Sequence, residues 1–146
     1  MQGKATLGGH PIHPMLVPFP IGFFGGAVIS DIITLTGHPD FWPRMSVTLI
    51  GFGIIAALLA AVFGFVDYFT APMEPPVKKT ATTHMILNLV VVLVYVAAFF
   101  IRAADPVSTF GYVLTFAGIV LLVASGWYGG HLAYVGRVGA KSGTEV

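Results

Sequence analysis

Residues 9–14, Gly-His-Pro-Ile-His-Pro, lead directly into a long apolar segment, and the rest of the chain repeats such segments. The hydrocarbon core of a bilayer requires about 20 predominantly apolar residues for each spanning helix. Four stretches meet that length, and we expect helices at about residues 15–36, 44–69, 83–102 and 109–130. The sequence therefore predicts an all-α fold: an integral membrane four-helix bundle that forms a single transmembrane domain over residues 1–146.

The composition supports this prediction and excludes several classes of function. Hydrophobic residues make up 56% of the chain and charged residues only 9%, whereas about a quarter of the residues in soluble domains are charged. A formal net charge of +1 does not provide the basic surface that nucleic acid requires, so we expect no nucleic-acid partner. The chain has no cysteine, which excludes disulfides and iron–sulfur ligation by this chain. Any redox chemistry therefore requires a bound cofactor.

The lead-in to the first helix carries two histidines. A proline disfavours helical conformation in the residue before it, so we expect the regular helix to begin only near Pro18 or Pro20. His10 and His13 are three residues apart, and both an α-helix and a polyproline segment nearly repeat at that spacing. We therefore expect the two imidazoles to point the same way.

The connections between the helices are short. Residues 71–79 are rich in proline and lysine and predict a loop before the third helix. The threonines that could cap that helix are Thr80, Thr82 and Thr83. Ser108 or Thr109 would cap the fourth helix. Because the two helical hairpins share neither a motif nor a loop length, we expect no internal repeat.

The distribution of cationic residues predicts the orientation. With four spans, the N-terminus, the second loop and the C-terminus lie on one side of the membrane. The cationic residues on that side are Lys4, Lys78, Lys79, Arg137 and Lys141, and those on the other side are Arg44 and Arg102. Cytoplasmic loops carry an excess of Lys and Arg, so we expect both termini in the cytoplasm.

Four of the five histidines fall near segment ends on this same side, and they are His10, His13, His84 and His131. Ionisable residues in or near membrane spans are costly and usually mark a functional site. We expect a cofactor site with His13 and His84 as ligands and the other two as alternates. His38 lies on the opposite side and is expected to be a solvated loop residue.

Further polar residues near the four histidines could support this site. Asn88 lies four residues after His84, on the same stripe of the third helix, and is expected to orient that imidazole. Asp67 would hydrogen-bond an imidazole or cap the third helix, and Arg137 would neutralise a cofactor carboxylate. Asp31 lies near the other side and is expected to pair with Arg44 or Arg102.

Two classes of cofactor use such imidazoles. A b-type haem requires two imidazoles on opposite faces of its ring, small residues beside it and cations for its propionates. The chain offers rows of glycine, alanine and serine in the first, second and fourth helices, although such rows also serve close helix packing without a cofactor. A non-haem zinc, copper or iron ion would instead use three histidines with Asp67 or a water molecule.

Several motifs together resemble a known family. They are residues 9–14, Gly64-Phe65-Val66-Asp67-Tyr68, His84 and Gly129-Gly130-His131-Leu132. They resemble the bacterial membrane proteins of domain of unknown function 2231, over nearly the whole chain. The resemblance implies a four-span domain of the bacterial inner membrane. In some members it is fused to a Rieske-type domain, which implies an iron–sulfur or cytochrome redox partner. Members of the family resemble this chain less at His131, where they carry a non-histidine residue, so the resemblance favours His10, His13 and His84.

Three functions remain open at this point. The first is a membrane electron-transfer protein that binds haem b through histidines near the cytoplasmic face. The second is a non-haem metal-dependent membrane enzyme. The third is a cofactor-free structural or assembly subunit, whose small-residue rows bind partner helices in a homo-oligomer or a larger complex.

Overall fold

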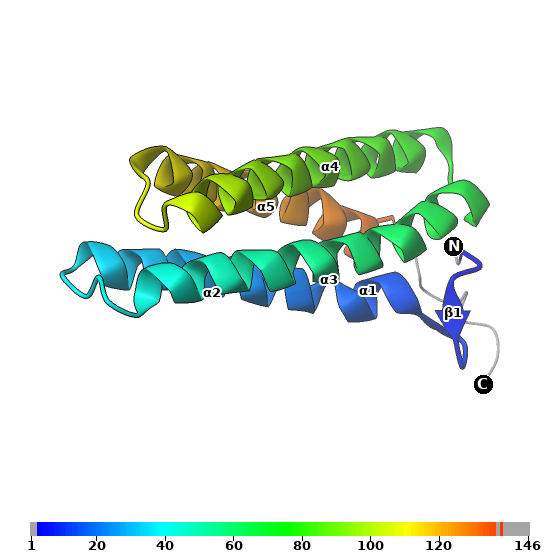
Figure 1. Cartoon of the computed structure of the whole chain (residues 1–146). Helices are drawn as coiled ribbons and strands as arrows, with labels where there is room; N and C mark the ends of the chain where they lie inside the picture. The colour runs from blue at the N-terminus through cyan, green and yellow to red at the C-terminus, as the bar shows by residue number, and fades with distance from the viewer. Residues whose placement is uncertain (1–2, 137, 139–146) are drawn as a thin grey trace.

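The computed structural model describes residues 3–136 and 138. The elements are β1 (Thr6–Leu7), β2 (His10–Pro11), α1 (Ile12–Leu16), α2 (Pro18–Leu35), α3 (Trp42–Thr70), α4 (Pro75–Ala104) and α5 (Thr109–Tyr134). Within the described chain, four helical segments are long and apolar enough to cross a membrane, with α1 and α2 together forming the first. The predicted all-α membrane bundle is confirmed (Figure 1).

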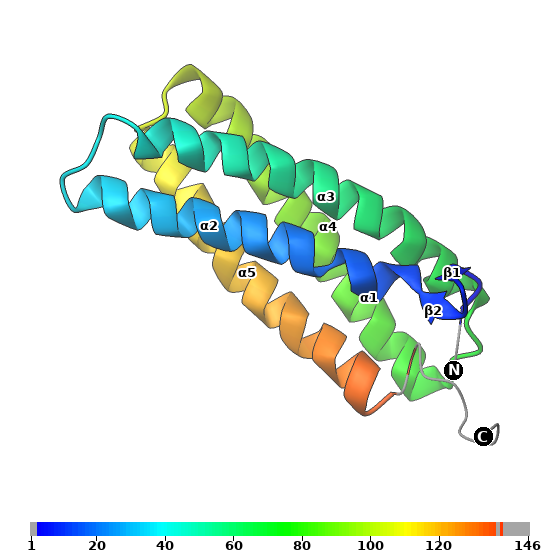
Figure 2. The ribbon, with the colours of Figure 1, turned by 90° about the horizontal axis from the view of Figure 1, so that it is seen from below.

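The helices form two antiparallel hairpins that lie side by side. Hairpin 1 consists of α1, α2 and α3, and hairpin 2 consists of α4 and α5. Helices pack most closely within each hairpin, while α3 against α4 and α2 against α5 join the two halves. Figure 2 shows the α2–α3 and α4–α5 connections at one end of the bundle and the β1–β2 pair at the other. We call the latter end, with the α3–α4 connection, the histidine end.

The lead-in is folded rather than simply extended. β1 and β2 form a short antiparallel pair, and Gly8 and Gly9 turn the chain between them with φ of 56° and 79°. The regular helix α2 begins at Pro18, as predicted, because the first helical turn does not need the missing N–H of proline. The short helix α1 separates the two, so His13 lies on a helix while His10 lies on a strand.

The third span begins earlier than predicted. Pro75 and Pro76 occupy the first turn of α4, where proline is well tolerated, so much of the expected loop at residues 71–79 is helical. The three candidate cap threonines therefore lie inside α4 and donate to carbonyls four residues earlier. Their predicted capping role is wrong. Ser108 does cap α5, since its Oγ accepts a hydrogen bond from the N–H of Gly111 at 3.4 Å.

The two hairpins bury equivalent positions. The pairs of buried residues in α2 and α4 are Pro20 and Val91, Phe24 and Tyr95, Ala27 and Ala98, and Asp31 and Arg102. The pairs in α3 and α5 are Ser46 and Gly111, Ile50 and Thr115, Gly53 and Gly118, and Ala60 and Ser125. Each set has a constant offset, so the bundle contains a structural repeat. The prediction of no internal repeat is wrong.

Contacts between equivalent residues join the hairpins at the centre of the bundle. The rings of Phe24 and Tyr95 stack with centroids 3.7 Å apart and planes 4° apart. A Cβ on Gly53 would lie 2.5 Å from the ring of Phe24, and one on Gly118 would lie 2.7 Å from the ring of Tyr95. Both glycines are therefore required for this close packing.

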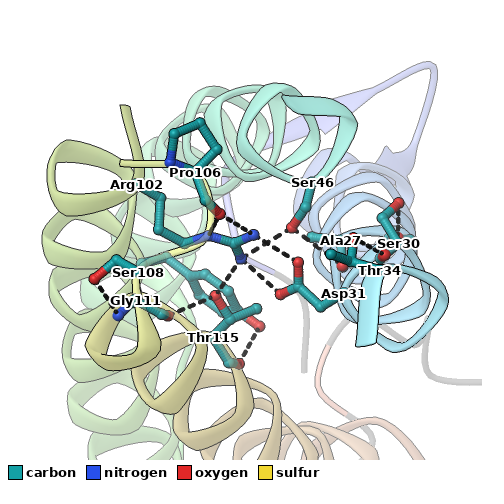
Figure 3. Close-up of polar contacts among 12 residues, drawn as sticks. Ala27, Ser30, Asp31, Thr34, Ser46, Arg102, Pro106, Ser108, Gly111 and Thr115 are labelled. Carbon is teal, nitrogen blue, oxygen red and sulfur yellow. Dashed lines mark hydrogen bonds and ion pairs between the residues drawn. The ribbon is translucent and has the colours of Figure 1, made fainter. Parts of the chain in front are cut away.

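A buried ion pair joins the hairpins near the end opposite the histidines (Figure 3). Arg102 donates to both carboxylate oxygens of Asp31, at 2.6 and 2.7 Å, and both side chains are 0% exposed. Its guanidinium also donates to Ser46 Oγ and Thr115 Oγ1, both at 3.1 Å, so all four spans contribute one side chain. The predicted pairing of Asp31 is confirmed, with Arg102 as the partner.

Candidate cofactor site

His13 and His84 occupy equivalent positions in the two hairpins, with the same offset as Asp31 and Arg102. The Nδ1 of His13 lies 2.8 Å from the carbonyl oxygen of Ala60, and the Nδ1 of His84 lies 2.9 Å from that of Ser125. Because a carbonyl oxygen only accepts, each Nδ1 carries the proton and donates. A neutral imidazole with this hydrogen bond has its lone pair on Nε2, which is the tautomer that metal-binding histidines commonly use.

A glycine lies against each imidazole. A Cβ on Gly64 would approach the Cε1 of His13 to 2.9 Å, and one on Gly129 would approach the Cε1 of His84 to the same distance. Each glycine follows the residue that supplies the carbonyl by one helical turn. The backbone of a single helix, α3 or α5, thus fixes each ring by a hydrogen bond and by close packing.

The two imidazoles lie at the boundary of the buried core. Both histidines are partly buried. Beyond them, towards the Asp31–Arg102 pair, Pro20 and Val91 are buried. The two imidazoles, one from each hairpin, therefore lie at the edge of the buried core.

The surroundings of the two rings differ in hairpin 2. The Nδ2 of Asn88 donates to the carbonyl oxygen of His84 at 2.9 Å and lies against its ring, 3.0 Å from Nε2 and 3.4 Å from Nδ1. Ser125 Oγ lies 3.1 Å from the Nδ1 of His84. The equivalent residues in hairpin 1 are Val17 and Ala60, which lack these groups. Within residues 3–136 and 138, nothing hydrogen-bonds to the Nε2 of His13.

The other predicted site residues lie elsewhere. His10 is exposed on β2, and His131 is exposed in the last turn of α5. Asp67 accepts a hydrogen bond on Oδ1 from the N–H of Ala5 at 3.1 Å, which ties the lead-in to α3. Arg137 lies outside the described residues. The structure thus places Asn88 beside His84, and it holds His13 and His84 each against the second helix of its own hairpin.

Acidic and imidazole side chains do not add further donors to this pair. Among the residues that the structure describes, no three His, Asp or Glu side chains are grouped to hold a metal ion. His38 is exposed in the connection between α2 and α3, as predicted.

Sequence reasoning missed the groups that hold the rings. Gly64 and Gly129 stood out as members of small-residue rows and of the family motifs, Ser125 only as a member of such a row, and Ala60 did not stand out. A signal was present, because the pattern Leu-x3-Gly-Ile-x9-Gly occurs twice, and its last glycine is the one against the imidazole. The two occurrences begin at Leu49 and Leu114.

Comparison with known proteins agrees with this architecture. The family model described as predicted membrane protein (DUF2231) matches residues 9–142, a region that includes both hairpins and both imidazoles. No curated protein and no solved structure matches the chain. The chain therefore belongs to the DUF2231 family of predicted membrane proteins.

Proposed function

We propose that the protein binds a b-type haem between its two hairpins, with His13 and His84 as axial ligands, and transfers electrons. One observation carries this proposal: two equivalent imidazoles, one from each hairpin, have Nδ1 bound to a backbone carbonyl and a lone pair on Nε2. Such a backbone hydrogen bond sets the ring orientation and raises the basicity of the ligating nitrogen.

The number of donors favours haem over a non-haem metal. A porphyrin supplies four nitrogens to its iron, so two imidazoles complete six-coordinate ligation. A non-haem zinc site takes at least three protein ligands, and copper and iron sites also draw on several side chains. A metal-dependent enzyme would therefore require His10, His131 or Asp67 to move to His13 and His84. The near two-fold relation of the hairpins also suits a flat ring with one ligand on each face.

The neighbouring residues suit a redox cofactor at this depth. The buried residues on the core side would keep water from one edge of the haem, and burial is one determinant of the haem reduction potential. The propionates would face water at the histidine end. Lys79 is exposed in the first turns of α4 at that end, whereas Lys78 already donates to the carbonyl of Tyr68. Lys79 and Arg137 are therefore the cations proposed for the propionates.

The proposed setting is the bacterial inner membrane with both termini in the cytoplasm. Arg102 is fully buried in its ion pair, so it does not act as a loop cation. Of the residues counted for the opposite side, Arg44 then remains, and the excess of cations at the histidine end becomes larger. An iron–sulfur protein or a cytochrome at the cytoplasmic face would exchange electrons with the haem. A homo-oligomer is compatible with the open glycine faces of α2 and α5.

The test is an absorption spectrum of the detergent-purified protein, oxidised and then reduced with dithionite, with metal analysis of the same sample. We expect a sharp reduced α-band and about one iron per chain, because one pair of axial imidazoles serves one haem. Zinc, copper or iron without porphyrin would instead support the metal-dependent enzyme. A protein with neither pigment nor metal would support the structural subunit.

A further inference from the structure

The two hairpins present their imidazoles from helices of very different length. His84 lies well inside α4, a helix of 30 residues, and the buried Ala81 precedes it by three residues. His13 is the second residue of α1, which has five residues, no side-chain cap and no buried residue. An isolated helix shorter than about 12–15 residues is only marginally stable. Contacts outside α1 are therefore needed to hold His13 in place.

The lead-in before α1 supplies such contacts. The N–H of Ala5 donates to Asp67 Oδ1 at 3.1 Å, and the N–H of Lys4 donates to Thr70 Oγ1 at 3.0 Å. Ala5 is buried, and a Cβ on Gly3 would lie 2.8 Å from the Cα of Asp67. The start of the lead-in thus packs directly on the last turn of α3.

The lead-in carries this attachment to α1. The chain leaves α3 at Ala5, turns back through β1 and β2, and returns to the same residue. There the carbonyl oxygen of Ala5 accepts the N–H of Ile12, the first residue of α1, at 2.9 Å. Because His13 follows Ile12 directly, its backbone lies one residue from a point that is tied to α3.

One face of α3 meets both the imidazole and the lead-in. The carbonyl oxygen of Ala60 lies 2.8 Å from the Nδ1 of His13, and Gly64 packs against the ring. Asp67 follows at the next turn, since residues three and four apart share a helix face. The equivalent position in hairpin 2 is Leu132, whose side chain has no hydrogen-bond acceptor. The carboxylate is therefore present only in the hairpin whose histidine lacks a long helix.

We propose that Asp67 is a positioning residue for His13: its carboxylate anchors the lead-in to α3 and thereby sets the imidazole against Ala60. This inference rests on the proposed haem function and adds to it a residue that acts through the lead-in. A hydrogen bond to a charged group changes an equilibrium by about tenfold or more. Loss of this bond should therefore raise the detached fraction of the lead-in by about tenfold.

The experiment records long-range proton–nitrogen NMR spectra of the metal-free full chain, which report the hydrogen bonding of each ring nitrogen. Asp67→Leu places the residue of hairpin 2 in hairpin 1. It should shift the His13 signals towards those of a free imidazole and leave those of His84 in place. Asp67→Asn keeps an oxygen that can accept the N–H of Ala5, so it should retain the wild-type His13 signals.

A matched control separates positioning from general stability. Asp105 Oδ1 also accepts one backbone N–H, that of Val107 at 3.2 Å, at the opposite end of the bundle. Asp105→Leu should therefore leave both imidazoles unchanged. Thr70→Val removes the neighbouring bond to Lys4 at nearly constant volume, and it repeats the test if Asp67→Leu does not fold. Unchanged His13 signals in the folded variant, or equal shifts at both histidines, overturn the inference.

Haem release distinguishes this inference from the haem function itself. Transfer of haem from the loaded full chain to an excess of apomyoglobin should be up to about tenfold faster in Asp67→Leu and unchanged in Asp67→Asn. Shifted His13 signals with an unchanged release rate overturn the positioning of a ligand. A chain that takes up no haem overturns the proposed function and the ligand role with it, and the NMR result then still shows whether Asp67 sets the His13 ring.

Discussion

Hairpins 1 and 2 share their geometry but not their chemistry at a few key positions. Both place a histidine, a ring-contacting glycine and an aromatic ring at equivalent positions, which build the site and the core. They differ where Asp31 faces Arg102 and where Val17 corresponds to Asn88. The shared residues give the two hairpins the same structure. The residues that differ make each hairpin complementary to the other hairpin rather than to a second copy of itself. Two copies of hairpin 1 would bring two buried carboxylates together.

The largest expected effect comes from breaking the charge complementarity. Arg102→Leu leaves the carboxylate of Asp31 buried without a partner, which should destabilise the protein by about 3–5 kcal/mol. The double variant Asp31→Leu/Arg102→Leu removes both charges and should regain most of that stability. Unfolding in detergent, followed by circular dichroism, measures both. Equal stability of the single and double variants would show that the pair does not hold the hairpins together.

The next effect tests the structural repeat at the aromatic stack. Gly53→Ala and Gly118→Ala each introduce a Cβ that overlaps a stacked ring, and each should destabilise the bundle by about 1–3 kcal/mol. Gly126→Ala is the control, because nothing lies within 4 Å of its added Cβ. The same unfolding measurement should find the stability of Gly126→Ala unchanged or slightly increased. A marked difference between the first two variants would argue against equivalent roles.

A third comparison concerns the glycines at the imidazoles. Gly64→Ala and Gly129→Ala should each displace one ring and lower the haem content of the purified protein by similar factors. Gly130 is the next residue of α5, and nothing lies within 4 Å of an added Cβ there. Gly130→Ala should therefore keep the wild-type haem content. The ratio of haem absorbance to protein measures all three. Loss of haem in Gly130→Ala would mean that the effect does not act through the ring.

The smallest expected effect concerns the N-termini of α3 and α5, which are the second long helices of the two hairpins. Ser108 caps α5 with its hydroxyl, whereas its equivalent Pro43 lies in the first turn of α3, which has no side-chain cap. Ser108→Ala should therefore cost about 1 kcal/mol. Thr83→Ala is the matched control, because Thr83 lies inside α4, and its hydroxyl bonds within the helix. Equal losses in the two unfolding curves would contradict the assigned cap.

Hydropathy and charge predicted the features that the bilayer constrains most strongly. The four spans followed from apolar length, and the pairing of Asp31 with either Arg44 or Arg102 followed from the cost of leaving a buried carboxylate unpaired. The common depth of His13 and His84 predicted that both would lie at one end of the bundle. Each of these predictions depends on the identity of a side chain, which the sequence states directly.

The features that the sequence did not predict depend on backbone groups or on a small number of conserved positions between the two hairpins. Any residue offers a carbonyl, so nothing in the sequence marks Ala60 or Ser125 as a hydrogen-bond acceptor for an imidazole. The repeat was hidden because lipid-facing positions accept Leu, Val, Ile or Phe alike, so that few identities survive between the hairpins. The start of α4 was missed because Pro75 and Pro76 predict a loop as readily as a first helical turn.

The electron paramagnetic resonance spectrum of the oxidised protein tests the central claim, that His13 and His84 together ligate a haem, most directly. The account predicts a low-spin ferric signal of two imidazole ligands in wild type and in His10→Ala/His131→Ala. It predicts conversion to a high-spin signal, or loss of haem, in His13→Ala and in His84→Ala. A low-spin signal that survives in either single variant would contradict the account, because an iron that keeps both imidazoles does not use that residue.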